Sequence, residues 1–287
     1  MPSTQIQWFP GHMAKTRRLI AENLRLVDLT VEVLDARIPE SSRNPEIKKL
    51  TDSKPRLVLL SKSAQADENI TRLWREYFEN RGEDCIFYDC KTGDGFSRIA
   101  PTAKRLCAEK LKGWEAKGMD GRHLRAMIVG IPNVGKSSLI NRLAADKKAK
   151  VEDRAGVTLD KQWVTTSIGI DLLDTPGVLW PKFDERRVGE NLAITGAIKD
   201  EIIDTDELAT VLCARLRELY PSLLRERYKI EFTSEMQSWE IVEKIGERRG
   251  FLVRGGEVDF SRTAKMILGE LRDGKIGRIS FEAPRGR

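Results

Sequence analysis

The chain has 287 residues, a formal net charge of +6, 40% hydrophobic and 33% charged residues. This length suggests about two domains, and the hydrophobic content suffices for an ordinary core. No apolar run approaches the roughly 18 residues of a membrane-spanning helix, and the N-terminus lacks the apolar stretch of a secretory signal. The four cysteines form no CxxC pair, so we expect reduced thiols, a cytoplasmic location and no membrane partner.

Short apolar runs alternate with helical patterns over most of the chain. The first part predicts strands at 29–35, 56–60, 84–88 and 126–129 and helices at about 13–27, 68–81, 96–118 and 138–143. Two more strands are expected at 163–168 and 170–173, with a turn at Gly169 between them. This alternation is typical of an α/β fold, a mostly parallel sheet with helices on both faces.

Strand patterns nearly vanish after Pro181. Helical patterns take their place at about 187–199, 206–218, 236–249 and 260–273. We therefore place a boundary at about 182–187 and predict two domains, 1–183 and 184–287. The second has a suitable length for a small all-α domain.

The segment from Gly130 to Ser137 carries the most specific motif of the chain. It fits G-x-x-x-x-G-K-[ST], the phosphate-binding P-loop, and it lies between a predicted strand and a predicted helix. Backbone N–H groups and the helix dipole make such a loop an anion site. We expect Lys136 to reach the β- and γ-phosphates and Ser137 to bind Mg²⁺. The predicted nucleotide contacts of this loop are Asn133, Val134, Gly135, Lys136, Ser137 and Ser138.

A second phosphate-side motif follows the strand at 170–173. Residues 174–177 read Asp-Thr-Pro-Gly, the Asp-x-x-Gly pattern that completes a nucleoside triphosphatase site. Asp174 is predicted to hold the Mg²⁺ shell, and the Gly177 N–H to sense the γ-phosphate. Thr158 is predicted to close over the metal as a catalytic switch residue. The spacing of these residues supports one set of metal ligands: Ser137, Thr158 and Asp174.

The base-side motif is altered and lies upstream of the P-loop. Guanine-specific enzymes of this class carry Asn-Lys-x-Asp after Asp-x-x-Gly, and residues 178–287 contain no such pattern. The nearest match is Ser61-Lys62-Ser63-Ala64, and the strand at 84–88 runs into Asp89-Cys90-Lys91, where a Ser-Ala-Lys-like loop is expected. Strand ends on one sheet edge define a site whatever their chain order. We therefore predict base-side contacts at Ser61, Lys62, Cys90 and Lys91, on the same edge as Gly135 and Asp174.

With these motifs in this order, the sequence resembles the circularly permuted GTPases, and most closely the bacterial ribosome biogenesis GTPase A family. The resemblance spans nearly the whole chain. Beside the P-loop and Asp-x-x-Gly, its carriers are residues 8–13 (WFPGHM), 35–39 (DARIP), 156–158 (GVT) and 254–259 (RGGEVD).

The resemblance implies a function as well as a fold. It implies a GTPase that uses GTP and Mg²⁺ and binds the large ribosomal subunit and its rRNA during late assembly. It also implies stimulation by K⁺, with Asn133 as a ligand, and it makes His12 the catalytic residue that orients the attacking water.

Two departures bear on specificity and rate. Ala64 replaces the carboxylate that pairs with guanine, so we expect weakened GTP selectivity, with Asp67 as one conceivable substitute. Ras-like enzymes place a water-orienting glutamine where this chain has Val178, so turnover should be slow alone and faster on the ribosome. Residues 245–287 carry ten Lys and Arg against six Asp and Glu, a charge that suits rRNA phosphates.

Three functions fit these observations. The first is an assembly GTPase, active as a monomer, whose nucleotide state sets the position of the C-terminal domain. The second is a nucleotide-holding rRNA chaperone with vestigial hydrolysis or relaxed base specificity. The third is a small-molecule P-loop kinase, disfavoured because no arginine-rich lid follows the P-loop.

Overall fold

A computed structural model describes residues 10–119, 121–144, 163–180, 183 and 185–284, with side chains from residue 17 onwards. The chain forms two compact units. The first, which we call the sheet unit, comprises residues 7–182 together with 282–287. The second, the helical unit, consists of residues 1–6 and Phe183–Phe281. Each unit is described by itself.

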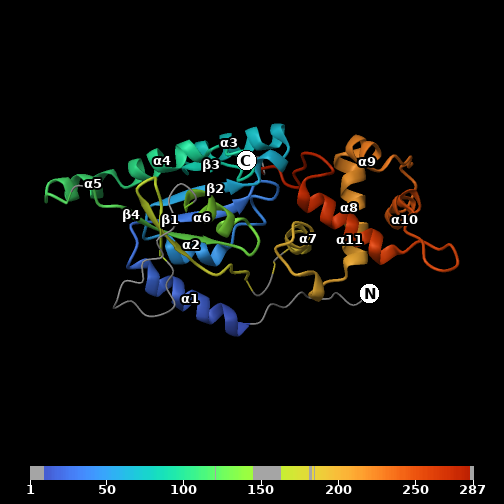
Figure 1. The fold of residues 1–287 in the computed structure, drawn as a ribbon, viewed down its shortest axis with the longest axis horizontal. Coiled ribbons are helices and arrows are strands. Elements are labelled where there is room, and N and C mark those ends of the chain that lie inside the picture. Colours follow the sequence, from blue (N-terminus) through green and yellow to red (C-terminus); the bar gives the residue numbers. More distant parts are fainter. Residues whose placement is uncertain (1–9, 120, 145–162, 181–182, 184, 285–287) are drawn as a thin grey trace. The chain divides into compact units, whose positions relative to one another are not determined.

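The sheet unit is built on a six-stranded sheet of order β3-β2-β1-β4-β6-β5 (Figure 1). Its strands are β1 Leu29–Asp35, β2 Arg56–Ser61, β3 Cys85–Phe87, β4 Leu124–Gly130, β5 Trp163–Thr165 and β6 Ile170–Asp174. Neighbouring strands are parallel, apart from β5, which pairs antiparallel with β6. The predicted α/β class with a mostly parallel sheet is thus confirmed.

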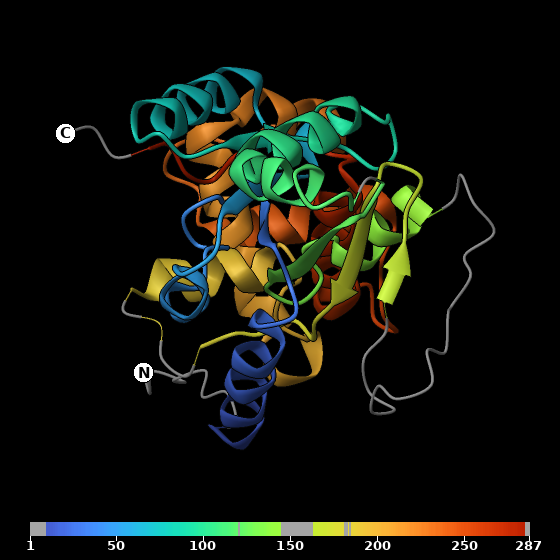
Figure 2. The same cartoon turned by 90° about the vertical axis from the view of Figure 1, so that its left-hand side faces the viewer.

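Helices cover both sides of this sheet (Figures 1 and 2). They are α1 Pro10–Leu24, α2 Pro45–Thr51, α3 Glu68–Asn80, α4 Ile99–Leu106 and α6 Lys136–Ala144, whereas α5 Ala108–Glu115 extends beyond the sheet from the end of α4 (Figure 1). The single helix predicted over 96–118 is wrong, because the chain breaks at Cys107 into α4 and α5. Helix α2 was not predicted, since its seven residues are too few to show a periodic pattern.

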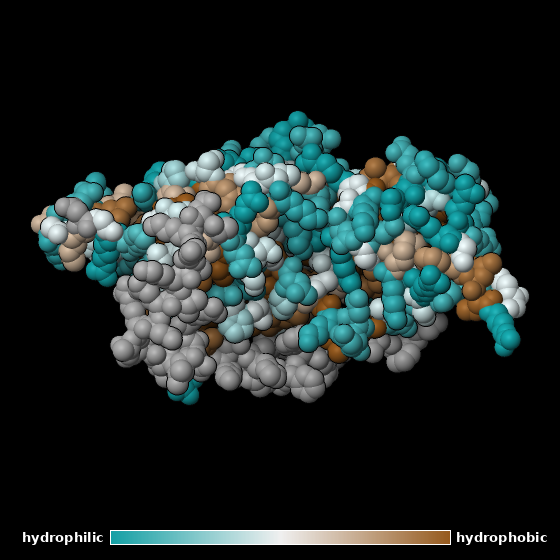
Figure 3. Space-filling model, in the orientation of Figure 1, coloured by the Kyte–Doolittle hydropathy of each residue, from teal (hydrophilic) through white to brown (hydrophobic). Residues whose placement is uncertain are grey.

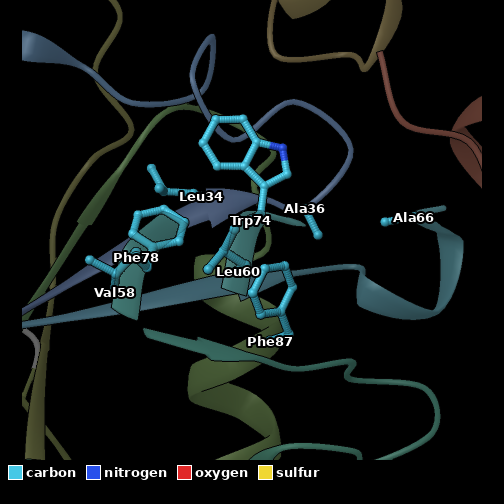
Figure 4. Close-up of a cluster of buried hydrophobic side chains, with 8 residues drawn as sticks. All are labelled: Leu34, Ala36, Val58, Leu60, Ala66, Trp74, Phe78 and Phe87. Atoms are coloured by element: carbon cyan, nitrogen blue, oxygen red, sulfur yellow. The ribbon is translucent and has the colours of Figure 1, made fainter. Parts of the chain in front are cut away.

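The buried face of α3 illustrates how the sheet is covered. Trp74 and Phe78 of this helix pack on Leu34, Val58 and Leu60 of the central strands (Figure 4). Residues alternate between the two faces of a strand. Because the alternate residues Val33, Leu57 and Leu59 are also fully buried, the opposite face is covered too. Both faces are therefore largely apolar, although β1 also carries the buried Glu32, which pairs with Arg43.

The helical unit has α8, Thr205–Leu219, at its centre. Helices α7 Arg186–Ile194, α9 Pro221–Tyr228, α10 Ser238–Arg249 and α11 Phe260–Asp273 all contact it. Gly246 lets α10 approach α11 closely, because a Cβ on this glycine would lie 2.4 Å from Val258 Cγ1 and 2.6 Å from Thr263 Oγ1. The predicted all-α character of this region is confirmed, although α9 was not predicted. No helix in the described part of the chain combines the length and the hydropathy needed to cross a membrane.

Candidate nucleotide-binding site

The base-side and phosphate-side loops meet at the carboxyl edge of the sheet. Ser61, at the end of β2, places its Oγ 2.6 Å from the Val134 carbonyl oxygen in the P-loop. The Lys62 ammonium donates to the Asn133 carbonyl oxygen at 3.2 Å. Loops encoded some 70 residues before Lys136 thus contact the P-loop directly. The prediction that they share one sheet edge with Gly135 is confirmed.

The P-loop joins β4 to α6 through a conformation that suits its sequence. Gly130 has φ +155°, and a Cβ there would lie 2.5 Å from the Val33 carbonyl oxygen. Asn133 is left-handed, with φ 54°, a conformation that asparagine tolerates better than most residues. Ser137 and Ser138 are exposed at the first turn of α6. The N–H groups of this turn have no partner within the helix, which makes it suited to an anion.

Lys136 turns its side chain back into the P-loop. Its side chain is only 8% exposed, and its Nζ donates to the carbonyl oxygens of Ile131 at 2.8 Å and Gly130 at 3.2 Å. Burial lowers the pKa of Lys136 to about 8, although the nearby Asp174 carboxylate favours the charged form. A negatively charged phosphate beside the ammonium would favour its charged form and so raise this pKa.

The Asp-x-x-Gly loop packs directly on the P-loop. The Val178 N–H donates to the Gly130 carbonyl oxygen at 3.2 Å. A Cβ on Gly177 would lie 2.6 Å from Pro132 N and 2.9 Å from Lys136 Nζ. Only a glycine lets the two phosphate-side loops approach this closely.

Asp174, the predicted metal-binding carboxylate, is the last residue of β6. Its Oδ1 is buried and has no hydrogen-bond partner within the described part of the chain. Burial raises the pKa of this carboxyl group, and Lys136 opposes that shift. No cluster of three or more His, Cys, Asp or Glu occurs among the described residues. A P-loop site needs none, because Mg²⁺ takes the remaining ligands from a hydroxyl, phosphates and water.

Lys62 is positioned by a buried ion pair. Arg37 and Asp35 are 1% and 2% exposed, and the Arg37 Nη2 donates to Asp35 Oδ2 at 2.8 Å. Lys62 Nζ contacts the same oxygen at 2.9 Å. Burial would raise the pKa of Asp35, but Arg37 and Lys62 outweigh it and hold the pKa below its ordinary value. The 35–39 motif thus anchors the base-side lysine.

Asp89 organises the other base-side loop and was missed by the sequence reasoning. Its Oδ1 accepts from the N–H groups of Lys91 at 2.7 Å and Thr92 at 3.2 Å. Its Oδ2 accepts from the Ala64 N–H at 3.3 Å. The available signal was the acidic residue directly before Cys90-Lys91, where a Ser-Ala-Lys loop has serine. Cys90 contributes its carbonyl oxygen, which accepts from Arg142 of α6 at 3.1 Å.

Of three further residues singled out from the sequence, the structure describes the side chain of only one. Asp67, considered as a substitute for the missing guanine carboxylate, caps α3 by accepting from the N–H groups of Asn69 and Ile70. His12 lies in α1, and its side chain is outside the described part. Thr158 lies outside the described residues altogether.

The fold and the site define a class of protein: a P-loop nucleoside triphosphatase whose base-side loops precede its phosphate loop in the chain. A family described as "50S ribosome-binding GTPase" matches residues 125–233. Ribosome biogenesis GTPase A of Bacillus licheniformis is 47% identical over 279 residues, covering 97% of this chain and 98% of the relative. The chain belongs to the ribosome biogenesis GTPase A family.

Further relatives and solved structures agree with this assignment. Ribosome biogenesis GTPase A of Thermotoga maritima is 31% identical over 97% of this chain and 95% of its own length. The GDP-bound structure of YlqF from the same organism has a TM-score of 0.63 at 29% identity, covering 93% of this chain and 99% of that one. A GNP-bound YlqF structure gives the same TM-score at 28% identity, with coverages of 95% and 100%. The protein is therefore a GTPase that binds GTP with Mg²⁺.

Proposed function

We propose that this GTPase acts in assembly of the large ribosomal subunit and contacts its rRNA. The observation that carries the proposal is the junction of Ser61 with Val134, since it joins the base-side and phosphate-side loops of the permuted chain. The relatives' names point to ribosome biogenesis, and the family description refers to 50S binding. Sedimentation with purified subunits tests it: GTP-dependent association with large but not small subunits is expected.

Within the site, each phosphate-side residue has a proposed role. Lys136 neutralises the β- and γ-phosphates, and Ser137, Thr158 and Asp174 complete the Mg²⁺ shell. The buried, unpartnered Asp174 Oδ1 supports the metal assignment. Mg²⁺ supplies charge neutralisation at the leaving and transferred phosphates. Asp174→Asn should lower Mg²⁺-dependent phosphate release at least about tenfold, and normal release at ordinary Mg²⁺ would remove Asp174 from the shell.

We further propose that His12 orients the attacking water. Val178 cannot do so, because its side chain is apolar and packs with Ile20 and Ile47 in the core. Ile20 belongs to α1, the helix that also carries His12. Phosphate release by wild type and His12→Ala, each with and without large subunits, tests the role. Stimulated turnover at the wild-type rate in His12→Ala would rule it out.

Asn133 is proposed as a K⁺ ligand. Its left-handed backbone, φ 54°, projects a short polar side chain from the P-loop, and amide oxygens are hard ligands suited to alkali cations. GTP hydrolysis should be faster in K⁺ than in Na⁺ for the wild type. Asn133→Ala should abolish that difference, and an unchanged K⁺ response would exclude the residue.

The helical unit is the proposed rRNA-binding part. Its C-terminal half has seven exposed basic residues: Arg248, Arg249, Arg254, Arg262, Lys265, Lys275 and Arg278. Arg272 is not among them, since it is only partly exposed and pairs with Asp200. The face of the molecule drawn in Figure 3 is largely hydrophilic. Affinity for rRNA should fall steeply with salt. Arg254→Glu should weaken binding, whereas Arg186→Glu, an exposed change outside this group, should not.

The sensor residue Gly177 shortly precedes Phe183, where the helical unit begins. We propose that the nucleotide state re-aims this unit. Small-angle scattering should therefore differ between GDP and a non-hydrolysable GTP analogue, and identical profiles would argue against the coupling. Size-exclusion chromatography with light scattering should give a monomer.

A second candidate function rests on Ala64 and Val178, which replace a guanine-reading and a water-orienting residue. In it the protein holds nucleotide as an rRNA chaperone with vestigial hydrolysis. Phosphate release decides between the two. Strong stimulation by large subunits supports the assembly GTPase, and none supports the chaperone.

A further inference from the structure

The base-side site lacks a carboxylate at the position where its motif calls for one. Ala64 is exposed and carries only a methyl group at the end of the Ser61–Ala64 segment. Guanine presents two N–H donors, at N1 and at the 2-amino group, and a site that reads them needs an acceptor there. A methyl group leaves those donors unpaired, which is costly in a partly desolvated pocket.

Asp89 brings a carboxylate to this place from the next strand. The parallel pairing of β2 and β3 aligns Leu60 with Phe87. The two strand exits therefore run side by side, and the Ser63 N–H donates to the Tyr88 carbonyl oxygen at 3.2 Å. Asp89 follows at once, and its Oδ2 lies 3.3 Å from the Ala64 nitrogen. The carboxylate missing from position 64 is thus present beside it.

Asp89 is only 3% exposed, and its hydrogen bonds leave one acceptor site unused. An ionised carboxylate offers about four acceptor sites. Oδ1 uses two of them for the N–H groups of Lys91 and Thr92. Oδ2 has the single bond to Ala64, which at 3.3 Å is the longest of the three. The remaining acceptor site is therefore on the oxygen that faces Ala64.

Other carboxylates near the two loops are committed elsewhere. Asp35 is bonded to Arg37 and Lys62. Asp67 caps α3, and Asp94 accepts from the Thr92 hydroxyl at 2.7 Å. Asp89 is the one whose oxygen adjoins the backbone of Ala64.

We propose that Asp89 is the guanine-specificity residue of this protein, and that its Oδ2 accepts from the N1–H and 2-amino edge of the base in place of the carboxylate missing at position 64. The proposal rests on GTP binding at this site. One charged acceptor site reads the edge less strictly than a bidentate carboxylate does. Selectivity for guanine over adenine is therefore retained but reduced.

Asp89→Asn tests base reading at the cost of one loop bond, the long one from the Ala64 N–H to Oδ2, so the ratio of GDP to XDP affinity is the readout. Asparagine keeps Oδ1, and with it the bonds to Lys91 and Thr92, but it replaces Oδ2 with an N–H₂ donor. That donor opposes the guanine 2-amino group and suits the C2 carbonyl of xanthine. Affinities for GDP, XDP and ADP with Mg²⁺ are measured by calorimetry on the full chain. Diphosphates avoid hydrolysis during the titration.

The wild type is expected to prefer GDP over ADP by about tenfold or more, as one charge-assisted hydrogen bond allows. Asp89→Asn should lower the affinity for GDP about tenfold or more and shift the ratio of GDP to XDP affinity towards XDP. Asp67→Asn is the matched control, because asparagine also caps helices and the ratio should stay at the wild-type value. Ala64→Asp in the Asp89→Asn background should restore the preference for GDP.

Equal losses of GDP and XDP affinity in Asp89→Asn would overturn the proposal, because they would show that Asp89 only supports the loop. So would equal GDP and ADP affinity in the wild type. Neither result touches the proposed assembly function, which depends on large-subunit association and stimulated phosphate release. Conversely, a GDP-selective protein with the expected ratio shift but no subunit association would refute that function and leave the role of Asp89 standing.

Discussion

Ser61 Oγ lies 2.6 Å from the carbonyl oxygen of Val134, and this contact joins the two halves of the nucleotide site. The Ser61 Oγ is also 3.0 Å from the Leu34 carbonyl oxygen. Ser61 is 2% exposed, so its bonds are shielded from water. The end of β2 is thereby fixed to the P-loop and to β1. We infer that Ser61 supports the site by holding β2 against the P-loop and β1.

Ser61→Ala should therefore loosen the site without changing its choice of base. Loss of the hydroxyl leaves buried carbonyl groups less well satisfied and should lower the free energy of unfolding by about 1–2 kcal/mol. Affinities for GDP and ADP should fall by the same factor. Urea denaturation and calorimetry measure the two effects. Ser53→Ala, at an exposed serine, should stay within about 0.5 kcal/mol, and a change in the GDP to ADP ratio for Ser61→Ala would contradict this role.

Lys136 should make the nucleotide-free protein more stable as the pH rises. Its folded-state pKa of about 8 lies below the ordinary value of 10.5, so the unfolded chain binds more protons between those values. Stability then increases with pH across this window and is lowest below pH 8. A shift of this size corresponds to on the order of 3 kcal/mol.

Urea unfolding at pH 7 to 10.5 of wild type and Lys136→Met isolates this contribution, because the other titrating groups are common to both. The wild type should gain stability relative to Lys136→Met as the pH rises. A constant difference would mean that the amine keeps its ordinary pKa in the folded protein.

Gly177→Ala should block nucleotide-dependent function through a steric clash. The new methyl group would lie 2.6 Å from Pro132 N and 2.7 Å from its Cα, and these backbone atoms cannot turn away as a flexible side chain could. We expect phosphate release to fall at least about tenfold. Gly113→Ala is the control, because a Cβ there meets nothing within 4 Å and alanine favours its helix. Normal turnover in Gly177→Ala would show that the P-loop and the Asp174–Gly177 loop can move apart without loss of GTP hydrolysis.

Arg272 should be a main support of the helical unit. Its guanidinium forms two 2.8 Å hydrogen bonds to Asp200 and donates to the carbonyl oxygens of Ala193 and Ile194 at the end of α7. Arg272→Met should lower the free energy of unfolding by about 2 kcal/mol, since it leaves these acceptors without their charged donor. Lys265→Ala, exposed on the same helix, should change it by less than about 0.5 kcal/mol. Equal effects of the two changes in denaturant titrations would argue against this support.

Elements with long regular patterns were predictable, and short or interrupted ones were not. The strands from Leu29 and Arg56 and the helix Phe260–Asp273 appear where their apolar spacing indicated. Helices α2 and α9 have seven and eight residues, too few for a period to show. At Cys107 the helical pattern continues while the backbone does not. No glycine or proline marks that break, so local residue preference does not reveal it.

By itself, the sequence determined the phosphate-side chemistry. Local spacing in the sequence defines both phosphate-side motifs. These are the P-loop, with its glycines, Lys136 and Ser137, and the Asp174–Gly177 loop. Only the tertiary structure shows which carboxylate lies beside Ala64. Residues 64 and 89 are distant in the chain, and the parallel register of β2 with β3 brings the Asp89 carboxylate to the Ala64 backbone. Local patterns carry no information on such a contact, because strand pairing sets it.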